Sequence, residues 1–226
     1  MQQQPSGTTT FLQRLASIVH SLRYILLGVL GALVVLIITW AIVIEVRSNR
    51  TESATVLAEH AQERLDEWID EEDEEKKAII AEELQGTLLS IIDTYPRLYA
   101  TQRAYHIQGS FLFRSEQWEV AANSFLDLAE KFPKSYLAPI SIVNAAVSYE
   151  EAEQDVRALE TYRRIIDEFA EVSPEIPRVL FSLGRLSETV GTTQQALEYY
   201  TRLVDEYSTS SWTNLARDRI IYLNLD

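Results

Sequence analysis

The sequence predicts an all-α protein: one N-terminal transmembrane helix followed by a right-handed solenoid of helix hairpins. Three observations predict it. The chain of 226 residues has only 7 glycines and 6 prolines and is rich in Ala, Leu, Glu and Arg, a composition that favours helices. Residues 24–44 form one apolar run without a charge, interrupted only by Thr39. Beyond residue 50, apolar residues recur every three or four positions, as on one face of a helix.

The whole composition excludes several classes of function. The formal net charge is −14, so nucleic acid is not an expected partner. The chain has no cysteine, which rules out disulfides and thiolate metal sites but does not identify a redox compartment.

Residues 1–22 are expected to be a short polar tail and residues 23–46 a transmembrane helix. The run YILLGVLGALVVLIITWAIVI spans 21 residues without a charge, and as a helix it would be about 31 Å long, close to the thickness of a hydrocarbon core. A cleaved signal peptide is the alternative, but its apolar region would be shorter and end in small residues, so an uncleaved signal anchor is predicted. Gly28 and Ala32 fit either helix pairing or ordinary membrane-helix composition.

The arginines around the span leave its orientation nearly balanced. Arg14 and Arg23 precede it, and Arg47 and Arg50 follow it. A short leader before one span is typical of bacterial inner-membrane proteins whose large domain lies in the periplasm, and this topology is expected here. A cytoplasmic adaptor domain is the alternative.

Residues 47–96 are expected to be an acidic helical neck, or a degenerate first hairpin. Thirteen acids against three basic residues lie in 51–83. Two apolar stripes are separated by DEEDEEKK at 70–77, which is predicted to be a solvated connection between two helices. The alternative, a divalent-cation site, lacks a glycine-containing loop of calcium-binding spacing.

Residues 97–210 contain a repeat. A small residue is followed twelve positions later by alanine in three pairs: Gly109/Ala121, Ala146/Ala158 and Gly184/Ala196. An aromatic ring lies four residues after each alanine: Phe125, Tyr162 and Tyr200. The spacing predicts antiparallel helix hairpins in which the small residues allow the two backbones to approach closely and the ring fills the wedge beside the crossing.

These residues resemble the tetratricopeptide repeat family, which carries a small residue in its first helix, an alanine opening its second helix, and an aromatic one turn later. The copies are separated by 37 and 38 residues, whereas the family period is 34. The extra residues are expected between hairpins, where the prolines lie. Residues 211–226 are expected to form a capping helix with Trp212, Leu215, Ala216 and Ile220 facing inward.

The resemblance implies a protein-binding groove lined by the first helix of each hairpin. Its positions lie six and three residues before the small residue and one and four after it. They give Arg103, His106, Ser110 and Phe113, with Arg114 beside them; Ile140, Val143, Val147 and Glu150; and Arg178, Phe181, Arg185 and Glu188. Packing between hairpins is the alternative role of Phe181. The lysine–asparagine clamp of relatives that bind chaperone tails is absent, since His106 and Ser110 occupy its first positions.

No catalytic or metal-binding motif is found, so the protein is not expected to be an enzyme or to hold a cofactor. The three histidines, His20, His60 and His106, do not share helix spacing. The order of span, neck and repeats resembles the ancillary subunit of the bacterial Sec translocon. That likeness implies chaperone-like handling of exported proteins as partners; a structural scaffold for envelope assembly or cell-division factors is the alternative.

Overall fold

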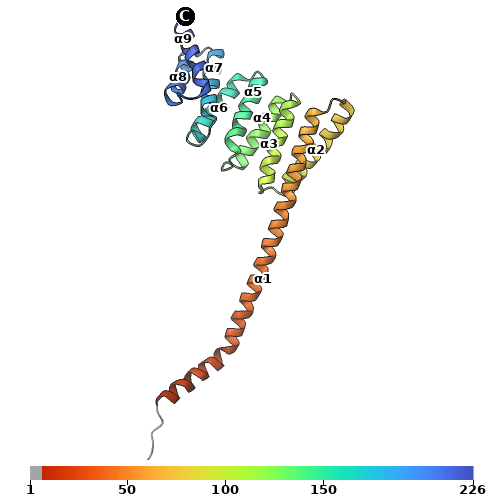
Figure 1. The fold of residues 1–226 in the computed structure, drawn as a ribbon, viewed down its shortest axis with the longest axis vertical. Coiled ribbons are helices and arrows are strands. Elements are labelled where there is room, and N and C mark those ends of the chain that lie inside the picture. Colours follow the sequence, from red (N-terminus) through yellow and green to blue (C-terminus); the bar gives the residue numbers. More distant parts are fainter. Residues whose placement is uncertain (1–6, 226) are drawn as a thin grey trace, which may run out of the picture. The chain divides into compact units, whose positions relative to one another are not determined.

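A computed structural model describes residues 7–225, with side chains for residues 22, 23, 25 and 27–225. All regular secondary structure in this range is helical, which confirms the all-α fold class (Figure 1). The helices are α1 (Gly7–Asp70), α2 (Glu74–Thr94), α3 (Tyr99–Arg114), α4 (Trp118–Lys131), α5 (Ala138–Glu151), α6 (Asp155–Phe169), α7 (Ile176–Thr189), α8 (Thr193–Glu206) and α9 (Ser211–Leu223).

The chain divides into two compact units, residues 1–52 and residues 53–226. The first unit contains the apolar part of α1. This helix begins at Gly7, so residues 7–22, expected as a polar tail, are helical, and residues 1–6 lie outside the described range. From Leu27 onward α1 is long and apolar enough to cross a membrane, and none of its apolar window is buried.

The second unit begins inside α1 and contains the rest of the acidic neck. Here α1 buries Ala54, Ala58, Ala61 and Leu65, together with the apolar face of α2. The two helices are separated by three residues of the acidic cluster. Asp73 caps α2, because its carboxylate accepts from the backbone N–H of Glu75 (3.0 Å) and Lys76 (3.2 Å).

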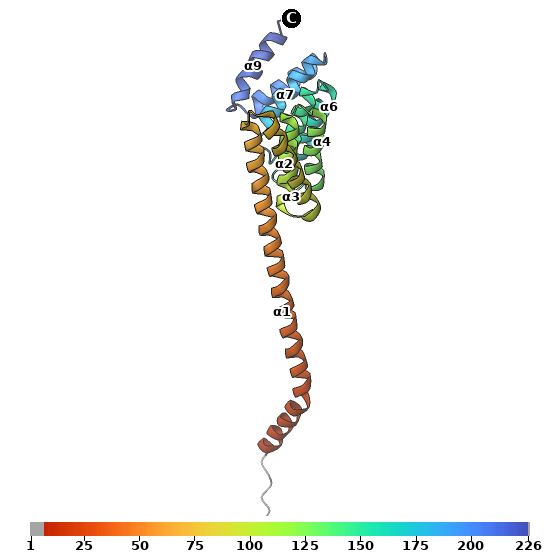
Figure 2. The same cartoon turned by 90° about the vertical axis from the view of Figure 1, so that its right-hand side faces the viewer.

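Three hairpins follow in chain order, and each helix packs against the next; Figure 1 shows the hairpins in sequence, and Figure 2 shows them turned by 90°. We call them hairpin 1 (α3/α4), hairpin 2 (α5/α6) and hairpin 3 (α7/α8). Pro139 and Pro177 lie in the first turns of α5 and α7, where a missing N–H is tolerated.

Each hairpin turns through the same three-residue connection. Glu116, Glu153 and Gly191, each five residues before the repeat alanine, have φ values of 59°, 57° and 79°. The next backbone N–H returns to a carbonyl of the preceding helix: Gln117 to Leu112 (2.9 Å), Gln154 to Tyr149 (2.8 Å) and Thr192 to Ser187 (2.8 Å). This is the helix-ending motif that a left-handed residue permits.

The repeat alanines do not open their helices, which corrects the sequence interpretation. Ala121, Ala158 and Ala196 are each the fourth residue of the second helix, because α4, α6 and α8 begin two residues after the left-handed residue of the turn. All three alanines are fully buried, at 0% exposure. They therefore face the core from the end of the first helical turn.

The closest neighbour of each repeat glycine is a ring and not the repeat alanine. A Cβ placed on Gly109 would lie 2.6 Å from the Phe125 ring, and one on Gly184 would collide with the Tyr200 ring; the three nearest atoms in each case belong to the ring and none to Ala121 or Ala196. The small residue of the first helix therefore makes room for the aromatic side chain of the second. This differs from the sequence interpretation, in which the ring lay beside a direct backbone approach.

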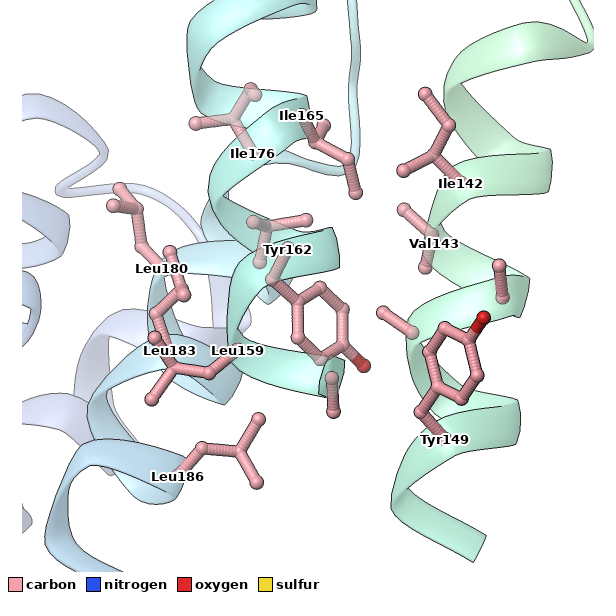
Figure 3. Close-up of a cluster of buried hydrophobic side chains, with 14 of the residues drawn as sticks. Ile142, Val143, Tyr149, Leu159, Tyr162, Ile165, Ile176, Leu180, Leu183 and Leu186 are labelled. Atoms are coloured by element: carbon pink, nitrogen blue, oxygen red, sulfur yellow. The ribbon is translucent and has the colours of Figure 1, made fainter. Parts of the chain in front are cut away.

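Between the hairpins lies a continuous core. Figure 3 shows α5, α6 and α7 contributing Ile142, Tyr162, Ile165, Leu180 and Leu183 to it, and all five side chains are fully or almost fully buried. Helix α9 covers the end of this core with Thr213 and Ala216, which are buried, and with Trp212 and Ile220, which are partly buried. Leu215, expected to face inward, is 47% exposed, so that expectation was wrong.

Candidate protein-binding surface

The predicted groove residues lie on α3, α5 and α7, whose exposed sides we call the first-helix surface. On α3, Arg103, His106, Ser110 and Phe113 are half-buried and Arg114 is exposed. The structure brings His106, Ser110, Phe113 and Arg114 together around one pocket, with Val147 of α5 on its wall, and leaves Arg103 outside it.

This pocket has a volume of about 450 Å³ and lies between α1, α3 and α5. Five of its lining side chains are apolar: Leu65, Ile69, Phe113, Phe125 and Val147. The sequence did not predict the wall from α1, which adds Gln62 and Asp66, nor Asn144 from α5. Leu65 lay on the predicted apolar stripe, but no repeat signature marks α1 as a neighbour of α3 and α5.

Val143 is not part of the surface. Its side chain is fully buried and points from α5 toward Tyr162 and Ile165 of α6 (Figure 3). The prediction that Val143 lines the groove was therefore wrong. Val147, one turn later, is only half-buried and reaches the pocket.

In hairpins 2 and 3 the first-helix surface is closed by a repeated polar cluster, the Tyr–Glu–Arg cluster. In hairpin 2 the Tyr162 hydroxyl donates to Glu150 (2.7 Å), which also pairs with Arg185 of α7. In hairpin 3 the Tyr200 hydroxyl donates to Glu188 (2.6 Å), which also pairs with Arg219 of α9. Each cluster thus joins two helices of one hairpin to the next element.

The electrostatics of these clusters follow from burial and charge. Burial, together with the neighbouring carboxylate, raises the pKa of Tyr162 and of Tyr200, so both hydroxyls stay protonated donors. Burial works against ionisation of Glu188, but hydrogen bonds from Arg219 and Tyr200 outweigh it and lower the pKa of this carboxyl. The Glu188 carboxylate is therefore ionised at neutral pH.

The remaining predicted groove residues of α7 are also engaged within the chain. Arg178 pairs with Glu175 at 3.6 Å, one turn before it. The Phe181 ring is half-buried and packs against Tyr200 and Trp212, with ring centroids 5.6 and 5.3 Å apart. Phe181 thus packs within hairpin 3 and against α9, and its place in a groove stays a prediction.

Hairpin 1 has apolar residues where the other hairpins have the Tyr–Glu–Arg cluster. Phe125 stands at the tyrosine position, Phe113 at the glutamate position, and Val147 at the position of the arginine that follows hairpin 2. The pocket occupies this place. Arg114 at its edge has no ion pair among the described residues, in contrast to Arg178 and Arg185.

His106 lies against the wall of the pocket. Its ring meets the Phe125 ring edge-on, with centroids 5.6 Å apart, and its Nδ1 is buried without a hydrogen-bond partner. Burial lowers the pKa of His106, so the neutral imidazole is favoured. Among the side chains that the structure describes, no group of three or more His, Asp or Glu is placed to hold a metal ion.

Stacked hairpins that expose one row of first helices define a solenoid of the repeat-protein class. The sequence pattern of the tetratricopeptide repeat matches residues 141–171, which correspond to hairpin 2. The chain is also 29% identical over 115 residues to a TPR repeat-containing protein of Treponema pallidum (strain Nichols). That alignment covers 50% of this chain and 46% of the relative, so the chain spans less than half of the relative's length.

The family comparison therefore identifies a tetratricopeptide repeat at hairpin 2, in agreement with the repeat spacing of the sequence. This family is a non-catalytic module that binds other proteins.

Proposed function

We propose that the protein is a single-pass inner-membrane protein whose solenoid binds extended segments of exported proteins in the periplasm, close to the Sec translocon. The observation that carries the proposal is the open, partly apolar pocket on the first-helix surface, in a chain that contains a tetratricopeptide repeat. Extended apolar segments are what unfolded clients expose, and a pocket that accepts one large side chain suits weak, repeated binding.

The exposed apolar stretch of α1 supports the anchor. From Leu27 to Ile44 this helix carries no charge, and none of its apolar window is buried by the rest of the chain. Such a surface is stable in hydrocarbon and unstable in water. An anchored chain should stay with the membrane after an alkaline carbonate wash, whereas a chain shortened by residues 1–46 should be released.

A structural scaffold is the second candidate, and the Tyr–Glu–Arg clusters favour it. They occupy the charged side chains of hairpins 2 and 3, whereas hairpin 1 has no such cluster and borders the pocket. One pocket of fixed shape suits one stable partner. The two functions thus predict different sets of bound proteins.

Photocrosslinking separates them. A photoreactive amino acid replaces Phe113 or Arg114 in the full-length protein in cells, and another replaces Val156, exposed on α6, as the control. Many different exported chains captured at Phe113 but not at Val156 support client handling. One dominant folded protein supports the scaffold. No product at Phe113 or Arg114 beyond the Val156 background contradicts both.

Topology is tested by cysteine labelling, which is clean because the chain has no native cysteine. Val172→Cys is placed on a highly exposed residue between α6 and α7. A membrane-impermeant maleimide should label it in intact spheroplasts if the domain is periplasmic. Labelling only after lysis would instead support a cytoplasmic adaptor.

A further inference from the structure

We infer that partner recognition is confined to the pocket between α1, α3 and α5, and that its ligand is an extended internal segment with a large apolar side chain next to a carboxylate. This inference rests on the proposed protein-binding function and names the partner chemistry of the same surface. It differs from recognition along the whole row of first helices, which the sequence predicted.

The first step is the contrast between equivalent positions. In hairpin 2, Glu150 pairs internally with Arg185, which the sequence assigned to the partner, and in hairpin 3 Glu188 pairs in the same way with Arg219 of α9. The tyrosine hydroxyls complete both clusters. A partner that bound there would have to break an ion pair that is already desolvated on its carboxylate side, which is costly.

The second step is the chemistry of the corresponding place in hairpin 1. Phe113, Phe125 and Val147 offer neither a charge nor a hydrogen-bond donor, and Leu65 and Ile69 of α1 extend the apolar wall. The volume of about 450 Å³ accommodates one large side chain and its backbone. Filling it with a tryptophan or phenylalanine removes apolar surface from water on both partners.

The third step is charge. The domain is acidic, yet the residue at the edge of the pocket on α3 is Arg114, which has no ion pair among residues 7–225 and is exposed. Across the pocket, the carboxylate of Asp66 already accepts from Gln62 (2.9 Å). The unpaired cation therefore selects a carboxylate on the ligand. His106 and Ser110 replace the clamp that would fix a chain terminus, so the carboxylate is assigned to an internal Asp or Glu side chain.

The test uses the full-length protein in lipid nanodiscs and four labelled decapeptides in a Ser/Gly background, all amidated at the C-terminus. The central residue is Trp or Ala, and its neighbours are Glu or Lys. Fluorescence anisotropy should show tightest binding for Trp with Glu, at least tenfold weaker binding for Ala with Glu, and about fivefold weaker binding for Trp with Lys. A free-acid version that binds much more tightly than the amide would overturn the internal assignment.

Variants then locate the site. Phe113→Glu combined with Val147→Arg and Phe125→Tyr transplants the cluster of hairpins 2 and 3 into hairpin 1 and should abolish peptide binding. Should this triple variant fail to fold, Val147→Arg alone, at a half-buried position, should weaken binding at least tenfold. Arg114→Gln should remove the preference for Glu over Lys while keeping the preference for Trp. Arg202→Gln, on α8, is the matched control and should change nothing.

Unchanged binding in the triple variant or in Val147→Arg, or the absence of any preference among the four peptides, overturns the inference. Crosslinking at Phe113 or Arg114 in cells would still support the proposed function in that case. Conversely, peptide selectivity without any protein captured in cells would support the ligand chemistry inferred for the pocket and contradict the proposed function.

Discussion

At the residue scale, the contact between glycine and ring explains why a small residue of the first helix is paired with an aromatic residue of the second. Gly109 and Gly184 lie under the rings of Phe125 and Tyr200, with no space for a side-chain carbon. Hairpin 2 has Ala146 at the same position, so a methyl group is tolerated there after local adjustment. These glycines therefore stabilise the hairpins by leaving room for the rings, since in a helix interior glycine is otherwise unfavourable.

The first prediction concerns Gly109→Ala. The added carbon overlaps a buried ring, and this overpacking should outweigh the better helix propensity of alanine, so the free energy of unfolding should fall by about 1–2 kcal/mol. Gly86→Ala in α2 is the control, because nothing lies within 4 Å of its added carbon. It should raise the free energy by about 1 kcal/mol. Urea denaturation measures both, and stabilisation by Gly109→Ala would contradict the packing argument.

A second residue-scale feature is the left-handed turn between the helices of each hairpin. Two of the three left-handed positions carry glutamate, Glu116 and Glu153, although only Gly191 has the residue suited to that conformation. A positive φ can be expected from sequence at Gly191, but nothing about a glutamate indicates one. The equal spacing of five residues before the repeat alanine was the available signal.

Glu153→Gly should therefore stabilise the protein by about 0.5–1 kcal/mol, since glycine adopts this conformation without the steric penalty of a side chain. Glu151→Gly, two residues earlier in the last turn of α5, is the matched control and should destabilise by about 1 kcal/mol. Thermal denaturation monitored by circular dichroism ranks the three proteins. Equal loss in both variants would argue against a strained turn.

The third prediction is a pH dependence that belongs to His106. Burial lowers its pKa below the usual value near 6.5, so the unfolded chain binds the proton more readily than the folded one. The free energy of unfolding should therefore be highest above pH 6.5 and should decrease as the pH falls from 6.5 toward the pKa of the folded protein. His106→Phe, the residue of hairpin 3 at this position, should flatten the decline in melting temperature between pH 7 and pH 5.

His60→Gln, on an exposed part of α1, should keep the wild-type decline. If the two variants had identical pH profiles, the buried imidazole would not be the source of the effect.

At the scale of the element, the Tyr–Glu–Arg cluster connects helices that are distant in sequence. Sequence reasoning placed Glu150, Arg185 and Glu188 on the correct helices, because the repeat spacing fixes a residue's position in its hairpin. It could not show that Arg185 pairs with Glu150, 35 residues earlier, since an ion pair between hairpins depends on their rotation relative to each other. Sequence spacing likewise did not show that Val143 is buried whereas Val147 is only half-buried.

The fourth prediction removes one hydroxyl from this cluster. Tyr200→Phe leaves the buried side of Glu188 without its donor, so the free energy of unfolding should fall by about 1–2 kcal/mol at pH 7. The loss should shrink as the pH falls below 4.5, the usual glutamate value, and through the lowered pKa of Glu188, because the carboxylate then becomes protonated. Tyr207→Phe is the control, and its effect should stay below about 0.5 kcal/mol.

At the scale of the whole molecule, the sequence did not show that the acidic neck packs against the repeats. The neck carries two apolar stripes but no small–aromatic repeat, so it was separated from the repeats at residue 96. In the structure, Leu65 of α1 and Leu84 and Leu88 of α2 share one core with Ile107 and Phe111 of α3. Residues 53–226 form the compact unit.

A fragment of residues 53–226 should therefore unfold at the same urea concentration as the domain in the full-length chain. A fragment of residues 97–226 should be less stable by several kcal/mol, because each large apolar side chain that it uncovers on α3 costs about 1.5–3 kcal/mol. Equal midpoints for the two fragments would show that the neck does not stabilise the repeats.

The buried residues of the second unit form two separate cores, one across α1, α2 and α3 and the other from α4 to α9. Leu112 is the partly buried side chain that touches both. The pocket draws Leu65 from the first core and Phe125 from the second. A ligand side chain in the pocket would contact both cores at once. The two cores should therefore unfold together, in one transition, when the pocket is occupied, whereas they can unfold in two transitions when it is empty.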